Sequence, residues 1–170
     1  MDDNAKFWKD LTSGRFASMV KESSKGQSLS NSLEAYHVLK PLFAKEDDVE
    51  RMYFIFLDSQ NRILSIVCLF SGTLQCCSIH TREMAKRLLA TKAAAIVIGH
   101  NHPSGDVTPS HEDRSITVKI GIAAASIDVH LHDHLIVGDG YHSMADIGWL
   151  RKVTREFSNL LKPTTKGDES

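Results

Sequence analysis

The chain has 170 residues, of which 42% are hydrophobic and 24% are charged, a composition that suits a globular protein with enough chain for one domain and its core. A formal net charge of -1 and a sequence pI of about 6.7 argue against nucleic-acid or anionic-membrane binding driven by overall charge. No apolar run approaches the roughly 20 residues that cross a bilayer, and the acidic start MDDNAKFWKD lacks a signal-peptide core, so we expect a cytoplasmic protein without a membrane partner.

The first part of the chain is polar and leads into one amphipathic helix. Residues 1–27 show no sustained apolar pattern, and we expect a poorly ordered arm there, with at most a short helix at 7–11. Apolar residues then recur with helical spacing over 30–43, and Ser30 is placed to cap that helix.

A β-hairpin and a second helix are expected next. Aromatic and branched residues at 51–57 and 63–70 predict two strands joined by a polar turn, and 73–79 predicts a shorter third strand. Thr81 is a cap candidate for a helix over 82–90. The residues of this helix that are expected to face the core are Met84, Leu88 and Leu89.

The second half of the chain alternates strands and helices. An almost entirely apolar segment at 93–99 is typical of a central strand that is covered on both faces. A turn-rich loop separates it from a helix at 110–125. A strand at 128–137, a short strand at 141–144 and a helix at 145–161 follow.

This order of elements predicts an α/β fold in which one mixed sheet carries helices on both sides. We expect a single domain over residues 28–161, preceded by the arm at 1–27 and followed by a flexible tail at 162–170. No internal repeat or low-complexity tract interrupts it.

The stretch from His100 to Asp113 reads HNHPSGDVTPSHED and directly follows the apolar strand. Because His100 and His102 are two residues apart, their side chains project to the same face of an extended chain. Pro103 and Gly105 then turn the chain. Asp113 falls in the first turn of the next helix, from which its carboxylate can reach back over the end of the strand.

Two imidazoles and one carboxylate can hold one metal ion. Three protein ligands with one open position are the arrangement of a catalytic zinc rather than of a closed structural one. A water molecule in that position would have its pKa lowered to about 7. We therefore expect Zn²⁺ as the cofactor, with iron as the alternative that the same ligand types can hold.

The same residues also have explanations that need no metal. Ser110 and Asp113 stand three residues apart at a helix start, which is the spacing of a capping box. A His-x-His pair at a strand end can be ordinary polar surface. The metal hypothesis rests on finding both features within fourteen residues, directly after a buried strand.

These motifs resemble a known protein family. HNHPSGDVTPSHED fits the pattern H-x-H-P-x6-S-x2-D of the JAMM, or MPN+, metalloprotease superfamily. With LFSGTL before it and DHLIVGDG after it, the stretch is similar to the RadC-like JAB-domain proteins, and the resemblance covers roughly residues 30–150. It implies an MPN/JAB-type domain that binds zinc and hydrolyses peptide or isopeptide bonds.

The resemblance also implies roles for individual residues. The zinc ligands would be His100, His102 and Asp113. Ser110 would help to hold the oxyanion of the tetrahedral intermediate, and a glutamate upstream would be the general base. Glu50, directly before the first strand, stands at the family's position for that base, and Glu83 in the segment HTREM is the second candidate.

Three further histidines, His130, His132 and His134, alternate along one expected strand and would share a face of the sheet. Asp133 and His134 would point to opposite faces, so they would not bind one ion together. We expect His134 to support the metal ligands or the fold rather than to form a second metal site.

The predicted function has alternatives from other classes. Full-length RadC-like proteins resemble this chain but generally carry an N-terminal helix-hairpin-helix region, which residues 1–27 do not match, so a DNA-repair role transfers poorly. A metal-dependent nuclease or DNA-repair accessory protein remains the alternative, with Lys86-Arg87 and Arg151-Lys152 as the basic candidates. A non-enzymatic interaction module is the third. We expect a protein or peptide substrate rather than a nucleic acid, and no motif indicates an oligomeric state.

Overall fold

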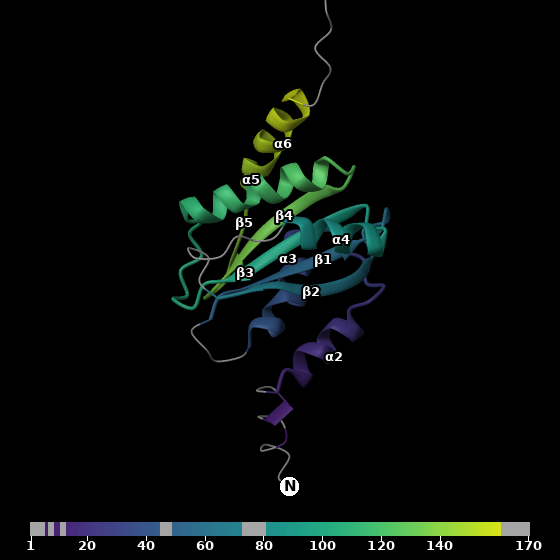
Figure 1. The fold of residues 1–170 in the computed structure, drawn as a ribbon. Helices are drawn as coiled ribbons and strands as arrows, with labels where there is room; N and C mark the ends of the chain where they lie inside the picture. Colours follow the sequence, from purple (N-terminus) through teal and green to yellow (C-terminus); the bar gives the residue numbers. More distant parts are fainter. Residues whose placement is uncertain (1–5, 7–8, 11–12, 45–48, 73–80, 161–170) are drawn as a thin grey trace, which may run out of the picture.

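The computed structural model describes residues 6, 9–10, 13–44, 49–72 and 81–160, and Figure 1 shows their arrangement. The helices and strands, in chain order, are α2 (Arg15–Ser23), α3 (Ser32–Leu39), the 3₁₀ turn η1 (Lys40–Phe43), β1 (Arg51–Leu57), β2 (Ile63–Ser71), α4 (Thr81–Thr91), β3 (Ala95–Asn101), α5 (His111–Ala125), β4 (His130–Val137), β5 (Tyr141–Ser143) and α6 (Trp149–Leu160). None of the helices among these residues is long and apolar enough to cross a membrane.

The strands form one mixed sheet in the order β2-β1-β3-β4-β5. β1 pairs antiparallel with β2 and β3, and β4 pairs antiparallel with β5. β3 and β4 are parallel, and α5 connects them as a crossover helix. The α/β class, the mixed sheet and the single domain that the sequence predicts are therefore confirmed.

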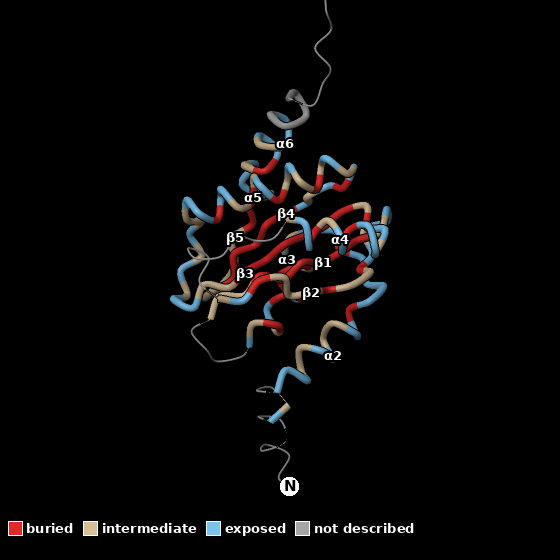
Figure 2. Tube along the Cα trace, in the orientation of Figure 1, coloured by how far each residue is buried: buried red, intermediate tan, exposed pale blue. Residues whose placement is uncertain are grey.

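Helices cover the sheet on both faces, and alternate residues of β1 pack against each side. Tyr53, Ile55 and Leu57 face the core shared with α3 and η1, and we call this side the α3 face. Met52, Phe54 and Phe56 face the core shared with α4 and α5, which we call the α5 face. The central strands are accordingly buried, as Figure 2 shows. Full burial of a phenylalanine contributes roughly 1.5–3 kcal/mol, so this alternation fixes which face each residue of β1 presents.

The N-terminal segments differ from the sequence prediction in two ways. α2 lies within the segment expected to be a poorly ordered arm, and Ala17 and Val20 explain it because they pack on the α3-face core. The helix expected over 30–43 begins at Ser32, and Asn31 rather than Ser30 caps it by accepting a hydrogen bond from the Glu34 backbone N–H at 2.9 Å.

Proline divides the same helix. α3 ends at Leu39 and continues as the 3₁₀ turn η1, in which Pro41 occupies an early position. Proline lacks a backbone N–H and clashes with the carbonyl four residues earlier, so the α-helical hydrogen-bond pattern cannot continue through it.

Smaller differences affect the later elements. Met84 and Leu88 of α4 are buried, but Leu89 is 67% exposed, because the residue after Leu88 lies about 100° further around the helix. The predicted strand at 73–79 lies outside the described residues. α6 begins at Trp149 rather than at residue 145, after Gly148 adopts a positive φ of 74°. In Figure 1 α6 extends beyond α5, away from the sheet.

Candidate metal centre

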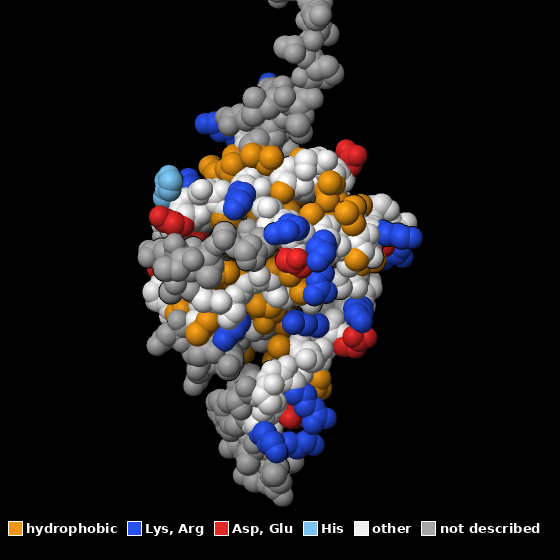
Figure 3. All heavy atoms as spheres, viewed as in Figure 1, with side chains coloured by type: hydrophobic (Ala, Val, Ile, Leu, Met, Phe, Trp, Pro, Cys, Tyr) orange, Lys and Arg blue, Asp and Glu red, His pale blue; other side chains and the backbone are white. Residues whose placement is uncertain are grey.

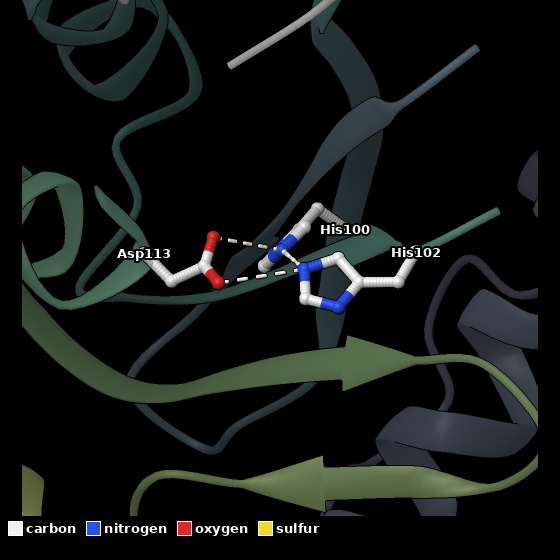
Figure 4. Close-up of side chains that lie close together, drawn as sticks. All are labelled: His100, His102 and Asp113. Atoms are coloured by element: carbon white, nitrogen blue, oxygen red, sulfur yellow. Dashed lines mark hydrogen bonds and ion pairs between the residues drawn. The ribbon is translucent and has the colours of Figure 1, made fainter. Parts of the chain in front are cut away.

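Three side chains converge on the α5 face at the end of β3, as Figure 4 shows. His100 Nε2 lies 2.9 Å from His102 Nε2. His100 Nε2 lies 3.0 Å from Asp113 Oδ1, and His102 Nε2 lies 3.4 Å from Asp113 Oδ2. The three ligand atoms, one from each residue, all lie within 4.8 Å of one another. The structure therefore brings together the three metal-ligand candidates that the sequence predicts.

The β-sheet positions the two histidines. His100 is part of β3, where it pairs with Met52 of β1 and Ile136 of β4. The predicted strand at 93–99 lies two residues too early, since β3 spans Ala95–Asn101. His102 follows the strand, and its backbone N–H donates to the Val137 carbonyl at 2.8 Å. His102 Nδ1 lies 2.6 Å from the Asp106 carbonyl oxygen, which can only accept, so Nδ1 carries the proton of the neutral ring. Nε2 of the neutral ring therefore keeps its lone pair, which faces the metal centre.

The first turn of α5 positions Asp113. Ser110 is the N-cap, and its Oγ accepts a hydrogen bond from the Asp113 backbone N–H at 3.0 Å. Asp113 Oδ2 in return accepts from the Ser110 backbone N–H at 2.8 Å and from the Ser110 hydroxyl at 2.7 Å. The capping box and the proposed ligand role thus coexist, because the same carboxylate caps the helix and faces both imidazoles.

A buried chain of hydrogen bonds supports His100 from behind. His100 Nδ1 and His134 Nε2 are 2.8 Å apart, His134 Nδ1 is paired with Thr117 Oγ1, and Thr117 donates to the Asp113 carbonyl. His100, His134 and Thr117 are all 0% exposed. If His100 Nε2 is to be free for a metal, His100 Nδ1–H must donate to His134, and His134 Nδ1–H must donate to the Thr117 hydroxyl oxygen. This chain connects two metal-ligand candidates and holds the His100 ring in one orientation.

The contact between His134 and His100 confirms the supporting role expected for His134. Sequence reasoning missed Thr117, although it follows Asp113 by four residues and therefore lies on the same side of α5.

The expectation that His130, His132 and His134 share a face is wrong. The β3–β4 register shifts between Ile96 and Val97, so β4 contains one extra residue, and the alternation changes within the histidine run. His132 instead bonds Asn61 on the α3 face and lines a cavity of about 270 Å³ there, on the other side of the sheet from His134. Among the described residues, the only potential metal-binding cluster is the one at His100.

The loop that carries His102 docks on the turn between β4 and β5. The Asp139 backbone N–H donates to the Gly105 carbonyl at 3.0 Å. A Cβ atom on Gly138 would lie only 2.3 Å from that carbonyl oxygen. Glycine at position 138 is therefore required by close backbone approach, which explains how the motifs HNHPSGD and VGDG act as one structural unit.

Burial and hydrogen bonding set the charges at the centre. Burial by itself would raise the pKa of Asp113, but the adjacent imidazoles of His100 and His102 outweigh it and hold the pKa well below its usual range. The hydrogen bond to Asp113 raises the pKa of His102 against the effect of burial. Burial lowers the pKa of His134 well below its ordinary value, which keeps this ring neutral. The centre is therefore an anionic carboxylate facing two imidazoles.

This arrangement fits a bound cation. Two imidazole Nε2 atoms at 2.9 Å repel each other through their lone pairs unless a proton or a metal ion lies between them. Asp113 Oδ1 is buried and accepts no hydrogen bond of good geometry, even though His100 Nε2 lies 3.0 Å away. A metal ion would satisfy all of these atoms at once, and two nitrogen ligands with one oxygen ligand suit a divalent transition-metal ion.

The two glutamates considered as general base occupy different environments. Glu50 directly precedes β1, and strand alternation places it on the α5 face with Met52, the pairing partner of His100. The negative charge of Glu50 acts electrostatically on the centre, because it contributes to the raised pKa of His102. Glu83 instead forms an exposed ion pair with Lys86 at 3.2 Å. The choice between them stays a prediction, and these placements favour Glu50.

Comparisons with known proteins place the chain in a family. The RadC-like JAB domain matches residues 29–149. A UPF0758 protein of Shewanella loihica is 46% identical over 106 residues, which cover 59% of this chain and 47% of that protein. A UPF0758 protein of Vibrio atlanticus is 44% identical over 102 residues, which cover 59% of this chain and 46% of that protein. One of Stutzerimonas stutzeri is 47% identical over 97 residues, which cover 56% of this chain and 43% of that protein.

The chain thus spans about half the length of these curated relatives, whose names state no substrate or reaction. The family match covers most of the chain, including β3, the loop and α5 that form the metal centre. The chain belongs to the RadC-like JAB domain family.

Proposed function

We propose that this chain is a JAMM-type zinc hydrolase that cleaves peptide or isopeptide bonds in a protein or peptide substrate. The observation that carries the proposal is the convergence of two imidazole Nε2 atoms on one buried carboxylate, of which Oδ1 accepts no hydrogen bond. Membership in the RadC-like JAB domain family supports it.

His100, His102 and Asp113 would hold the ion, and each is oriented by a second contact of its own. A zinc ion bound there would supply a Lewis acid and make a water molecule acidic enough to ionise near neutral pH. The hydrogen bonds that orient each ligand would limit the reorganisation that metal binding requires.

Glu50 would act as the general base. Its carboxylate would take a proton from the attacking water and deliver it to the leaving amine, a role that contributes typically about 10²–10⁴-fold to a rate. Its place on the α5 face and the effect of its charge on His102 support this assignment.

Ser110 would help to stabilise the oxyanion. Its hydroxyl donates to Asp113 Oδ2 at 2.7 Å, so the proton must turn from this carboxylate towards the substrate.

Elemental analysis of the purified protein, prepared without chelators, tests the metal. We expect one zinc per chain in the wild type and none in His100→Ala. Absence of stoichiometric metal from the wild type would overturn the proposal. Release of fluorophore from a panel of peptide and isopeptide substrates then tests the reaction. Glu50→Gln should lose about 10²–10⁴-fold in rate, whereas the matched variant Glu83→Gln should retain it.

A nuclease that uses the same centre is the alternative function. Several Lys and Arg side chains lie on the face shown in Figure 3, over α4 and α2, which favours this reading. In these segments of the chain, Lys86 of α4 pairs with Glu83, and Lys25, just after α2, pairs with Glu22. Binding of DNA whose affinity falls steeply with salt, together with metal-dependent cleavage, would establish the nuclease in place of the peptidase.

A further inference from the structure

The pairing between β1 and β3 ends just where the metal centre begins. The last paired residues are Met52 and His100. Beyond them the side chain of Asn101 contacts the β1 side: its Oδ1 accepts from the Arg51 backbone N–H at 2.7 Å, and its Nδ2 donates to the Val49 carbonyl at 3.1 Å. A side-chain amide therefore takes the place of the next backbone pair of the ladder.

These two bonds bracket Glu50. They hold the backbone group on each side of it, at residues 49 and 51. On the opposite side of the chain, the Glu50 carbonyl accepts a hydrogen bond from the Gly72 backbone N–H at 2.9 Å. The backbone around Glu50 is thus fixed from both neighbouring strands, although it lies outside β1 itself.

The bracket also determines where the Glu50 side chain goes. An extended backbone keeps the alternation of β1, so Glu50 lies on the α5 face with Met52, next to the residue row that contains His100. Asn101 stands between His100 and His102 in the chain, so the segment that carries Glu50 is fastened directly to the metal-ligand segment.

We propose that Asn101 is a positioning residue whose amide holds Glu50 beside the metal centre, an inference that rests on the proposed function. The chemistry requires an amide at this position, since one short side chain must offer an acceptor to Arg51 and a donor to Val49. An aspartate lacks the donor, and an alanine lacks both groups.

The test uses Co²⁺ as a spectroscopic probe in the full chain, with wild type, Asn101→Ala, Glu50→Gln and the double variant. Metal content and the pH midpoint of the visible cobalt spectrum are measured for each. An anionic neighbour disfavours loss of a proton at the site, so Glu50→Gln should lower that midpoint by about 0.5–1 pH unit. Asn101→Ala should shift it in the same direction, and the double variant should match Glu50→Gln.

Amide hydrogen exchange provides a readout that does not involve metal. The Arg51 amide should exchange at least about tenfold faster in Asn101→Ala than in the wild type. The matched control is Asn31→Ala, which removes an asparagine-to-backbone bond on the α3 face. It should reduce stability without moving the cobalt midpoint. Asn101→Leu, similar in size and lacking both hydrogen-bonding groups, replaces the alanine variant if that variant does not fold.

The outcomes separate this inference from the proposed function. If Glu50→Gln shifts the midpoint and the Asn101 variant does not, the positioning role is overturned while the metal hydrolase proposal stands. If neither variant shifts it in metal-loaded protein, Glu50 is not beside the metal and the inference fails with that assignment. If the wild type binds no metal, the proposed function fails and the inference fails with it.

Discussion

Asp113 and Asp133 are both buried carboxylates, 1% and 6% exposed, on opposite faces of the same sheet. Asp133 is satisfied by protein groups: Oδ1 accepts from the backbone N–H groups of His134 and Ala145, and Oδ2 accepts from the Ser143 hydroxyl at 2.6 Å. Asp113 is equally buried, yet its Oδ1 faces the Nε2 atom of His100 and accepts no hydrogen bond of good geometry. Protein donors satisfy both oxygens of Asp133, whereas Oδ1 of Asp113 has an unfilled position that a cation can occupy.

The pKa values of the two carboxylates are also shifted in opposite directions. Burial raises the pKa of Asp133 against the effect of its hydrogen bonds. Burial acts in the same direction on Asp113, but the adjacent imidazoles of His100 and His102 outweigh it, and the pKa falls. A buried carboxylate that stays ionised beside two imidazoles has the properties of a metal ligand, whereas Asp133 has those of a structural junction.

Asparagine at each position tests this contrast and should give the largest effect. Asp113→Asn should weaken metal binding by well over ~100-fold, since even changes behind the ligands cost about 10–100-fold. Asp133→Asn should retain the metal and instead lose about 1–3 kcal/mol of folding stability, because its backbone and hydroxyl donors lose a charged acceptor. Metal titration and urea unfolding measure the two. Equal metal loss in both variants would contradict the division of roles.

The hydrogen-bond chain behind His100 should give the next largest effect. His134→Ala should lower metal affinity by about 10–100-fold, because His100 loses the partner that fixes its tautomer and ring orientation. Thr117→Val should cost about 1–3 kcal/mol of stability by leaving the buried Nδ1 atom of His134 without a partner. Competition with a chelator and thermal unfolding provide the measurements. As a control, Thr154→Val removes a threonine-to-backbone bond on α6 and should leave metal affinity unchanged.

The pH dependence should have opposite signs in the metal-free and metal-loaded protein. His102 has a pKa raised above 6.5, so its protonated form stabilises the metal-free fold below pH 6.5, and this contribution is lost as pH rises through the raised value. Metal needs the unprotonated ring, so below that value affinity should fall by about tenfold per pH unit for one displaced proton.

Melting temperatures across this pH range, with and without zinc, check both signs. The metal-free protein should lose stability as pH rises through the window, while the increase caused by zinc grows. His102→Gln should abolish the first trend. Parallel trends in the two forms would show that His102 does not exchange a proton for the metal.

Removing helix caps should have the smallest effect and refine the comparison of the two faces. Ser110→Ala and Asn31→Ala each remove a cap and should each cost about 1 kcal/mol of stability. Only Ser110→Ala should alter metal affinity, because its hydroxyl also contacts Asp113. Denaturant unfolding and metal titration of both variants measure this. A change in affinity in Asn31→Ala would mean that the two faces are coupled through the sheet.

The sequence by itself determined the three metal-ligand candidates and the class of fold. His100 and His102 share a face because side chains alternate along a strand, and Asp113 is placed by the cap of its own helix. All of these relations act within fourteen residues, so local rules suffice to predict them. The hairpin of β1 and β2 was predictable for the same reason, because strand pattern and turn are adjacent in the chain.

Only the tertiary structure decided how distant residues complete the centre. The extra residue in β4 places His134 on the opposite face of the sheet from His132. The position of this extra residue depends on how β4 pairs with β3, which the sequence of β4 alone does not specify. The His134–Thr117 chain and the Asn101 bracket around Glu50 join residues that lie 17, 34 and about 50 positions apart. Strand register and helix packing bring such groups within hydrogen-bonding distance, and no local pattern encodes that register.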